Sequence, residues 1–136
     1  MRVLLLAVLL LLSTFALTPS SKSYTKIPKF KVRVTATAYT SLAHLTDSTP
    51  FLTASMTRTR VEYRNGVQWH VVAVSRDLLT VFPYGSKVFL RCPNRLIYGL
   101  VEDTMHIRWR RRVDIWFPDL SQALRWGKKE CILEGR

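Results

Sequence analysis

Three aspartates occupy the positions in this chain that are best suited to chemistry, beside or within apolar segments. Asp77 follows Val-Ala-Val-Ser-Arg, Asp103 follows Gly-Leu-Val-Glu, and Asp114 lies inside Arg-Val-Asp-Ile-Trp-Phe. The chain has nine acidic residues against 21 lysines and arginines, so carboxylates are scarce. A carboxylate beside apolar side chains costs free energy unless it is paired or has a task. These positions are therefore the first candidates for a functional site.

The alternation of residues 112–117 predicts the direction of the Asp114 side chain. Successive side chains of a strand point to opposite faces, so the three apolar residues Val, Ile and Phe take the core side. Asp114 then shares the open face with Arg112 and Trp116, a setting that suggests a sugar-binding site. Asp103 ends the preceding predicted strand, and a loop of ten residues that turns back would bring it to Asp114.

Paired carboxylates are the groups that glycosidic cleavage uses. One of them must be protonated to give its proton to the leaving oxygen, and burial or a like-charged neighbour raises its pKa for that task. Arg112 argues against this role, because a nearby cation lowers a carboxylate's pKa and would leave Asp114 able to act only as a base. The alternative is structural, with the aspartates capping turns or pairing with the many arginines.

The periodicity of the chain predicts six short strands and one helix. The strands are expected at residues 31–39, 69–75, 87–91, 96–102, 112–117 and 129–133. Asp119 is expected to cap the helix and Gly127 to end it. The spacings are too short for repeated βαβ units, which indicates a small closed barrel.

The N-terminal segment is typical of an exported protein. Residues 1–17 read as a signal peptide, 18–30 as a flexible tether, and 31–136 as one domain. The alternatives for the apolar run are a buried core helix or an uncleaved anchor. We expect the mature protein in the periplasm or outside the cell, with membrane contact only through the signal peptide. Export allows Cys92 and Cys131 to form a disulfide, although two isolated buried thiols are the alternative.

The net charge of +12 bears on the expected partners. It favours either solubility or attraction to anionic polymers outside the membrane. Export argues against nucleic acid as a partner. The same holds for the basic and aromatic run at 108–112, which is interpreted as a solvated loop or a glycan-contacting loop. No cofactor is expected, and we expect a monomer. No metal site is expected either, because metal-ligand spacing is lacking among the histidines, His44, His70 and His106.

Six segments, in order, resemble the bacterial three-aspartate domain. They are Thr-Ala-Thr-Ala-Tyr (35–39), Val-Ala-Val-Ser-Arg-Asp (72–77), Phe-Pro-Tyr-Gly-Ser-Lys-Val (82–88), Gly-Leu-Val-Glu-Asp-Thr (99–104), Arg-Val-Asp-Ile-Trp (112–116) and Gln-Ala-Leu-Arg-Trp-Gly (122–127). Each segment is a weak signal alone, but their order is specific. The resemblance extends over residues 32–133. It implies kinship with the catalytic domain of membrane-bound lytic transglycosylase A and with small secreted muralytic proteins of spore-formers.

The resemblance implies an all-β fold, a six-stranded double-psi β-barrel with one short C-terminal helix. It also implies that Asp114 is the catalytic acid and base and that Asp103 assists it, on peptidoglycan glycan strands. The implied reaction cleaves the bond between N-acetylmuramic acid and N-acetylglucosamine without water and gives a 1,6-anhydro product. Asp77 is in addition a candidate for organising a barrel turn. The residues expected to bind substrate are Asp77, Trp116, Thr104, Tyr39 and Arg112.

The linker between the last two aspartates departs from the enzymes of the family. Theirs resembles Gly-Gly-Ala-Ile-Lys-Gly, whereas residues 105–111 here are bulky and basic at the same spacing. A subgroup of three-aspartate proteins shares this linker and the segment Asp-Ser-Thr-Pro-Phe-Leu-Thr-Ala-Ser at 47–55. Two further hypotheses therefore accompany the enzymatic one. The barrel binds cell-wall glycan without cleaving it, or it is a structural envelope protein.

Overall fold

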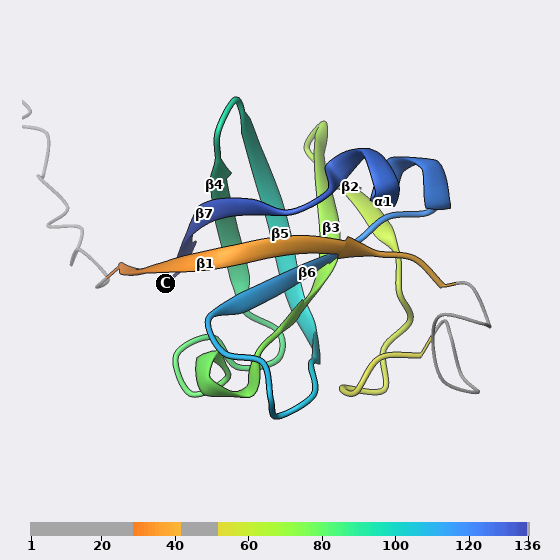
Figure 1. The fold of residues 1–136 in the computed structure, drawn as a ribbon. Helices are drawn as coiled ribbons and strands as arrows, with labels where there is room; N and C mark the ends of the chain where they lie inside the picture. The colour runs from red at the N-terminus through yellow and green to blue at the C-terminus, as the bar shows by residue number, and fades with distance from the viewer. Residues whose placement is uncertain (1–28, 42–51, 136) are drawn as a thin grey trace, which may run out of the picture.

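The fold was analysed in a computed structural model that describes residues 29–41 and 52–135 (Figure 1). The expected signal peptide, most of the tether and part of the 47–55 segment lie outside the described residues. The elements in chain order are β1 (Phe30–Tyr39), β2 (Val61–Arg64), β3 (Val67–Val74), the 3-10 helix η1 (Arg76–Leu78), β4 (Lys87–Cys92), β5 (Arg95–Thr104), β6 (Arg112–Trp116), α1 (Leu120–Trp126) and β7 (Lys129–Gly135).

Six of the strands close into a barrel in the order β3-β5-β4-β7-β1-β6, and β6 pairs again with β3. The pairs β1–β6 and β3–β5 are parallel, and the other four pairs of the barrel are antiparallel. The predicted all-β barrel with one short helix is confirmed. In Figure 1 the β2–β3 and β4–β5 hairpins point to the same end of the barrel as α1, and η1 lies at the opposite end.

The barrel pairings have an internal twofold symmetry. Exchanging β1 with β5, β3 with β6, and β4 with β7 turns every strand pair into another pair of the same direction. The β3–β6 and β4–β7 pairs are their own equivalents under this exchange. Each half of the chain therefore contributes one member to each parallel pair, which gives the crossing connections of a double-psi barrel.

The barrel interior follows from the alternation in the sequence. Val34 and Ala36 of β1 and Val113 and Ile115 of β6 are almost completely buried, while the residues between them are not. Fully burying one such side chain contributes on the order of 1.5–3 kcal/mol. The core is completed by the buried side chains of Val72, Val74, Val88, Leu90, Ile97, Val101, Phe117, Trp126 and Leu133.

The helix and its two ends agree with the prediction. The Asp119 carboxylate accepts a hydrogen bond from the Gln122 N–H at 2.9 Å, which satisfies one of the free donors of the first turn. Gly127 ends the helix with a φ of 68°, a conformation that costs other residues more. Trp126 anchors α1 to the barrel, because its ring is buried and its Nε1–H donates to the Ala36 carbonyl at 3.4 Å.

Strand β2 was not predicted, and it is a correction to the six-strand count. It pairs outside the barrel with β3 across the Asn65–Gly66 turn, and its sequence Val-Glu-Tyr-Arg is too polar to show a buried face. Strand β1 begins at Phe30, the last residue of the expected tether, and β7 continues to Gly135. No helix among the described residues has the length and apolar character needed to cross a membrane.

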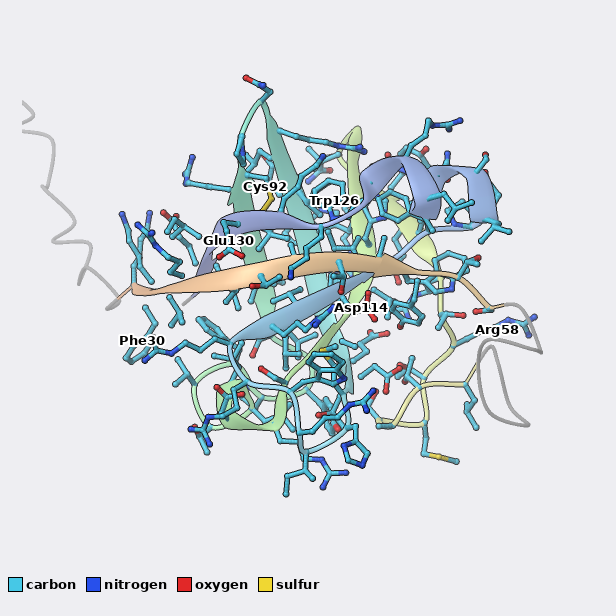
Figure 2. All side chains as sticks on the ribbon, in the orientation of Figure 1. Phe30, Arg58, Cys92, Asp114, Trp126 and Glu130 are labelled. Atoms are coloured by element: carbon cyan, nitrogen blue, oxygen red, sulfur yellow. A yellow bond between two sulfur atoms is a disulfide. The ribbon has the colours of Figure 1, made fainter. Side chains whose placement is uncertain are left out.

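The two cysteines are joined. Cys92, at the end of β4, and Cys131, in β7, form a disulfide with an S–S distance of 2.10 Å (Figure 2). The pairing of Arg91 with Ile132 places Cys92 and Cys131 side by side in adjacent strands. The alternative of two separate buried thiols does not apply to this structure.

Candidate active site

Four strands bring the two key aspartates into one row. Asp103 of β5 pairs with Ala73 of β3, Ala73 pairs with Asp114 of β6, and Asp114 pairs with Thr37 of β1. Paired residues point to the same face of a sheet, and the neighbours of this row fill the barrel core, so the row faces outward. The Cα atoms of the two aspartates are two strand spacings apart, about 10 Å. The side chain between them, that of Ala73, is small and buried.

A β-bulge directs Asp103 to this face. Val72 pairs with Val101, but the next residue, Ala73, pairs with Asp103, so Glu102 is an extra residue in β5. In a regular register Glu102 would pair with Ala73, and Asp103 would pair with Val74, whose side chain is in the core. Bulges commonly redirect a side chain next to an active site. The predicted approach of Asp103 to Asp114 thus occurs across β3, rather than through a turning loop alone.

Asp114 lies in the wall of a pocket of about 390 Å³. Burial raises the pKa of its carboxyl to about 6. The Thr37 hydroxyl, which donates to Asp114 Oδ1 at 3.1 Å, and the charge of Arg112 lower the pKa, and the Asp103 carboxylate raises it. Burial therefore outweighs the effect of Arg112 that the sequence indicated. The pocket is lined by Ala38, Tyr39, Thr40, Asp114, Leu120, Ala123 and Leu124.

Arg112 contacts Thr37 and Trp109. Its guanidinium lies 3.9 Å from the centre of the Trp109 ring, and its Nε–H donates to Thr37 Oγ1 at 3.5 Å. The Thr37 hydroxyl thus accepts from Arg112 and donates to Asp114. Arg112 therefore helps to orient the hydroxyl that holds Asp114, while its charge lowers the pKa of Asp114 less than burial raises it.

Asp103 is anchored by hydrogen bonds. Its Oδ1 accepts from the backbone N–H groups of Ala54 and Thr104, both at 2.9 Å. Its Oδ2 accepts from the Tyr39 hydroxyl at 3.5 Å. Burial, and then the charges of Asp103 and Asp114, raise the pKa of Tyr39 far above its usual range, so this hydroxyl stays protonated and remains a donor. The Thr104 hydroxyl donates to the Val74 carbonyl and fixes the end of β5.

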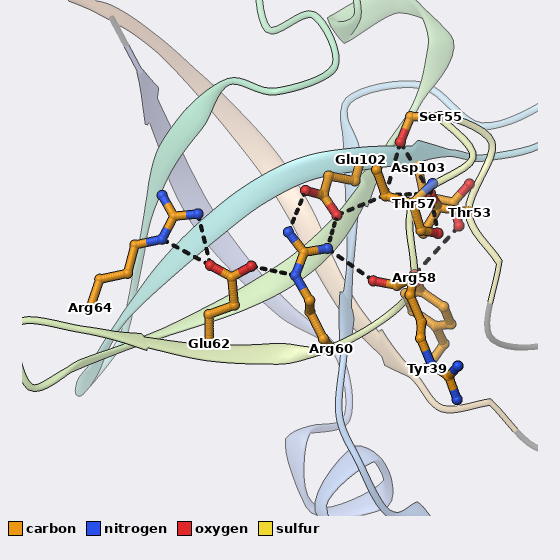
Figure 3. A network of polar contacts seen from close by, with 10 residues as sticks. All are labelled: Tyr39, Thr53, Ser55, Thr57, Arg58, Arg60, Glu62, Arg64, Glu102 and Asp103. Atoms are coloured by element: carbon orange, nitrogen blue, oxygen red, sulfur yellow. Dashed lines mark hydrogen bonds and ion pairs between the residues drawn. The ribbon is translucent and has the colours of Figure 1, made fainter.

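The bulged Glu102 holds a loop over this end of the barrel, and sequence reasoning missed it (Figure 3). Arg60 donates to both Glu102 oxygens, at 2.6 and 2.8 Å, and the Thr57 hydroxyl donates to one of them at 2.8 Å. The Ser55 N–H donates to the Glu102 carbonyl. The same loop supplies the Ala54 N–H to Asp103, so the ion pair positions a backbone donor at the site. The signal for this role that the sequence offered was a glutamate within a mostly apolar strand.

Asp77 organises a turn and does not belong to the row of site residues. Its Oδ2 accepts from the Arg111 N–H at 3.0 Å, where Arg111 has a φ of 46° and leads into β6. Burial would raise the pKa of Asp77, but the nearby Ser75 hydroxyl and the Arg111 N–H outweigh it, so the pKa is lowered. This placement matches the turn-organising role considered for Asp77. The described contacts give no direct link from Asp77 to Asp103 or Asp114.

The aromatic side chain beside Asp114 differs from the expectation. Trp116 is 7% exposed and donates from Nε1 to the Ser41 hydroxyl at 2.7 Å, so its ring is not an open face. Trp109 is a partly exposed aromatic residue near the site, and its ring is contacted by Arg112 at 3.9 Å and Arg108 at 4.8 Å. His106 is exposed and accepts from the Arg108 N–H; no described contact joins it to an aspartate.

Comparisons with known proteins add no assignment. Among the described residues, no group of three or more histidines, cysteines, aspartates and glutamates is placed to hold a metal ion. A scan against protein-family models finds no matching family, and a search of curated proteins finds no match.

Proposed function

We propose that this protein is a peptidoglycan-cleaving enzyme of the lytic transglycosylase type, exported to the periplasm or the cell exterior. The observation that carries the proposal is the Asp114 carboxyl, which lies at the wall of an open pocket with its pKa raised to about 6. A general acid works best when its pKa is near the working pH. The resemblance to the three-aspartate domain supports the same residue as acid and base.

The proposed reaction uses one group twice. Protonated Asp114 gives its proton to the glycosidic oxygen as the bond from that oxygen to C1 of N-acetylmuramic acid breaks. The Asp114 carboxylate then takes the proton of the 6-hydroxyl, and the 6-oxygen bonds to C1 to form the 1,6-anhydro ring. The proton count returns to its starting value, and no water is consumed. Burial favours the first step, because it disfavours the charged form of Asp114.

Neighbouring residues support the two steps in different ways. The Thr37 hydroxyl orients the carboxyl through Oδ1 and leaves Oδ2 for the substrate. The Asp103 carboxylate lies on the other side of β3, where its negative charge stabilises the positive charge that develops at C1. Tyr39, Thr104 and Arg112 act as positioning residues, because their described contacts are with Asp103, Val74 and Thr37.

The test is digestion of purified sacculi, followed by mass spectrometry of the released muropeptides. Wild-type protein should release 1,6-anhydro products, and Asp114→Asn should lower the rate at least a thousandfold. Glu130→Gln is the matched control, because Glu130 is an exposed carboxylate of β7 outside the pocket, and its activity should equal that of wild type. The activity should fall as pH rises through about 6, where Asp114 loses its proton. Intact sacculi after incubation with wild type would refute the proposal.

The linker favours a second candidate, a glycan-binding barrel that does not cleave. Trp109 between two guanidiniums offers an aromatic and cationic surface next to the site, which suits binding of an acidic glycan. In that case wild type and Asp114→Asn should both sediment with sacculi, and neither should release products. Trp109→Ala should then weaken sedimentation, whereas the enzymatic proposal requires product from wild type.

A further inference from the structure

A second, smaller pocket lies on the opposite side of α1 from the Asp114 pocket. Its volume is about 170 Å³, and it is lined by Arg95, Phe117, Gln122, Arg125, Trp126 and Lys129, which we call the cationic pocket. Arg95 begins β5, Arg125 lies in the last turn of α1, and Lys129 begins β7. Two segments that are distant in sequence, the start of β5 and the junction of α1 and β7, therefore bring three positive charges to one place.

These charges have no carboxylate partner in the part of the chain that the structure describes. The ion pairs found there involve Glu62, Glu102 and Glu134, and none includes a cation of the cationic pocket. Asp119 is near enough to Arg125 for that charge to help lower the pKa of Asp119, but the two form no ion pair. The cationic pocket thus has an excess of positive charge.

Aromatic rings hold two of the cations without neutralising them. Lys129 Nζ lies 4.0 Å from the centre of the Trp126 ring, and the Arg95 guanidinium lies 5.5 Å from Trp126 and 5.9 Å from Phe117. A ring face attracts a cation through its quadrupole but carries no net charge. The C-terminal end of α1 adds a partial negative charge of at most about one half. The three positive charges therefore exceed the negative charge that the described residues place near them.

Gln122 gives an independent indication of a missing ligand. Its Oε1 is buried and has no hydrogen-bond partner among the described residues, although a buried polar atom normally has one. The hydrogen bonding of Gln122, in the wall of the same pocket, is thus incomplete among the described residues.

We propose that the cationic pocket binds a phosphate group. Two guanidiniums and an ammonium are the donors that proteins use for phosphate, and a phosphate monoester carries about −1.5 to −2 charges at neutral pH. A carboxylate, with one charge, would leave most of the excess uncompensated. The volume equals that of about five or six waters, which is enough for one phosphate group and too small for a disaccharide. The inference does not depend on the proposed cleavage reaction.

The test follows the indole N–H resonance of Trp126 by NMR during titration with inorganic phosphate. Saturable shifts are expected, and acetate should bind at least tenfold more weakly. A second arm uses N-acetylglucosamine 6-phosphate. Tighter binding of this ester would identify a phosphorylated glycan as the source of the group, and tighter binding of inorganic phosphate would identify the free anion. The absence of saturation with both probes would overturn the proposal.

Charge-matched variants separate a site from diffuse attraction. Arg95→Gln and Lys129→Gln should each weaken phosphate binding at least tenfold. Lys128→Gln removes the same charge from an exposed neighbour outside the cationic pocket and should leave the affinity within twofold of wild type. Equal losses in all three variants would show nonspecific surface binding and overturn the proposal. Unchanged amide spectra away from the cationic pocket would establish that each variant is folded.

Discussion

Asp114→Asn should make the protein more stable at neutral pH, although it removes a proposed catalytic group. Burial raises the pKa of Asp114 from the ordinary 3.8 to about 6 in the folded protein. Between these values the folded state holds a proton that the unfolded state has lost, so stability decreases as pH rises. Above pH 6 the folded protein carries the full cost of the buried charge, about 3 kcal/mol. Asparagine removes the charge and keeps an acceptor for Thr37.

The assay is equilibrium unfolding in urea, with the disulfide intact and tryptophan fluorescence as the signal. At pH 7.5 the variant should exceed wild type by up to about 3 kcal/mol, and the difference should shrink toward zero as pH falls through 6 to 4. Asp119→Asn is the control of opposite sign. Its carboxyl has a lowered pKa, so this variant should be less stable than wild type at pH 7.5 and should approach it in acid. If Asp114→Asn lowers the free energy of unfolding by the same amount at pH 7.5 and at pH 4, the buried-charge argument is wrong.

Three further predictions concern the scaffold. Reduction of the β4–β7 disulfide, which joins residues 39 apart, should lower the free energy of unfolding by about 4 kcal/mol; equal urea midpoints with and without reductant would contradict this. Glu102→Gln weakens the Arg60 ion pair and should cost about 1–3 kcal/mol, with faster amide exchange in residues 53–60 but not in the β4–β7 pair. Gly135→Ala places a methyl group 2.6 Å from the Phe82 ring and should cost about 1–3 kcal/mol by thermal unfolding; an unchanged melting temperature would show that the ring can move.

Local patterns were sufficient for most of the elements. Alternation predicted the extent of β1 and the inward residues of β6, and the Asp119 cap and Gly127 end predicted α1 almost to the residue. These signals depend on periodicity and backbone chemistry within one segment, so tertiary contacts did not change them. Strand β2 has no such signal, because it is stabilised by pairing with β3 and by ion pairs of Glu62 with Arg60 and Arg64.

The candidate site was only partly predictable, for reasons of register and burial. The bulge at Glu102, which directs Asp103 to the outer face, could not be predicted from the sequence, because a bulge is a relation between two strands. Trp116 was expected to be exposed because it alternates with the core residue Ile115. That alternation is correct, but the Trp116 ring is buried on the outer face as well. The influence of Arg112 was overestimated because the sequence could not show how deeply Asp114 is buried, and burial raises its pKa more than Arg112 lowers it.

The two nearby aspartates differ in their properties because the sequence breaks the internal symmetry of the barrel. The twofold exchange that relates the halves makes Asp114 equivalent to Ala73 and Asp103 equivalent to Thr37. A fully symmetric sequence would place the same residue type at both equivalent positions and would give two like carboxylates in like surroundings. Here each aspartate has a neutral residue at its symmetry-equivalent position. Asp103 accepts hydrogen bonds from two backbone N–H groups and a tyrosine hydroxyl, whereas Asp114, in a buried pocket wall, accepts from one described hydroxyl. More donors favour the ionised form, and burial favours the protonated one, so the loss of symmetry gives the two carboxyls different surroundings.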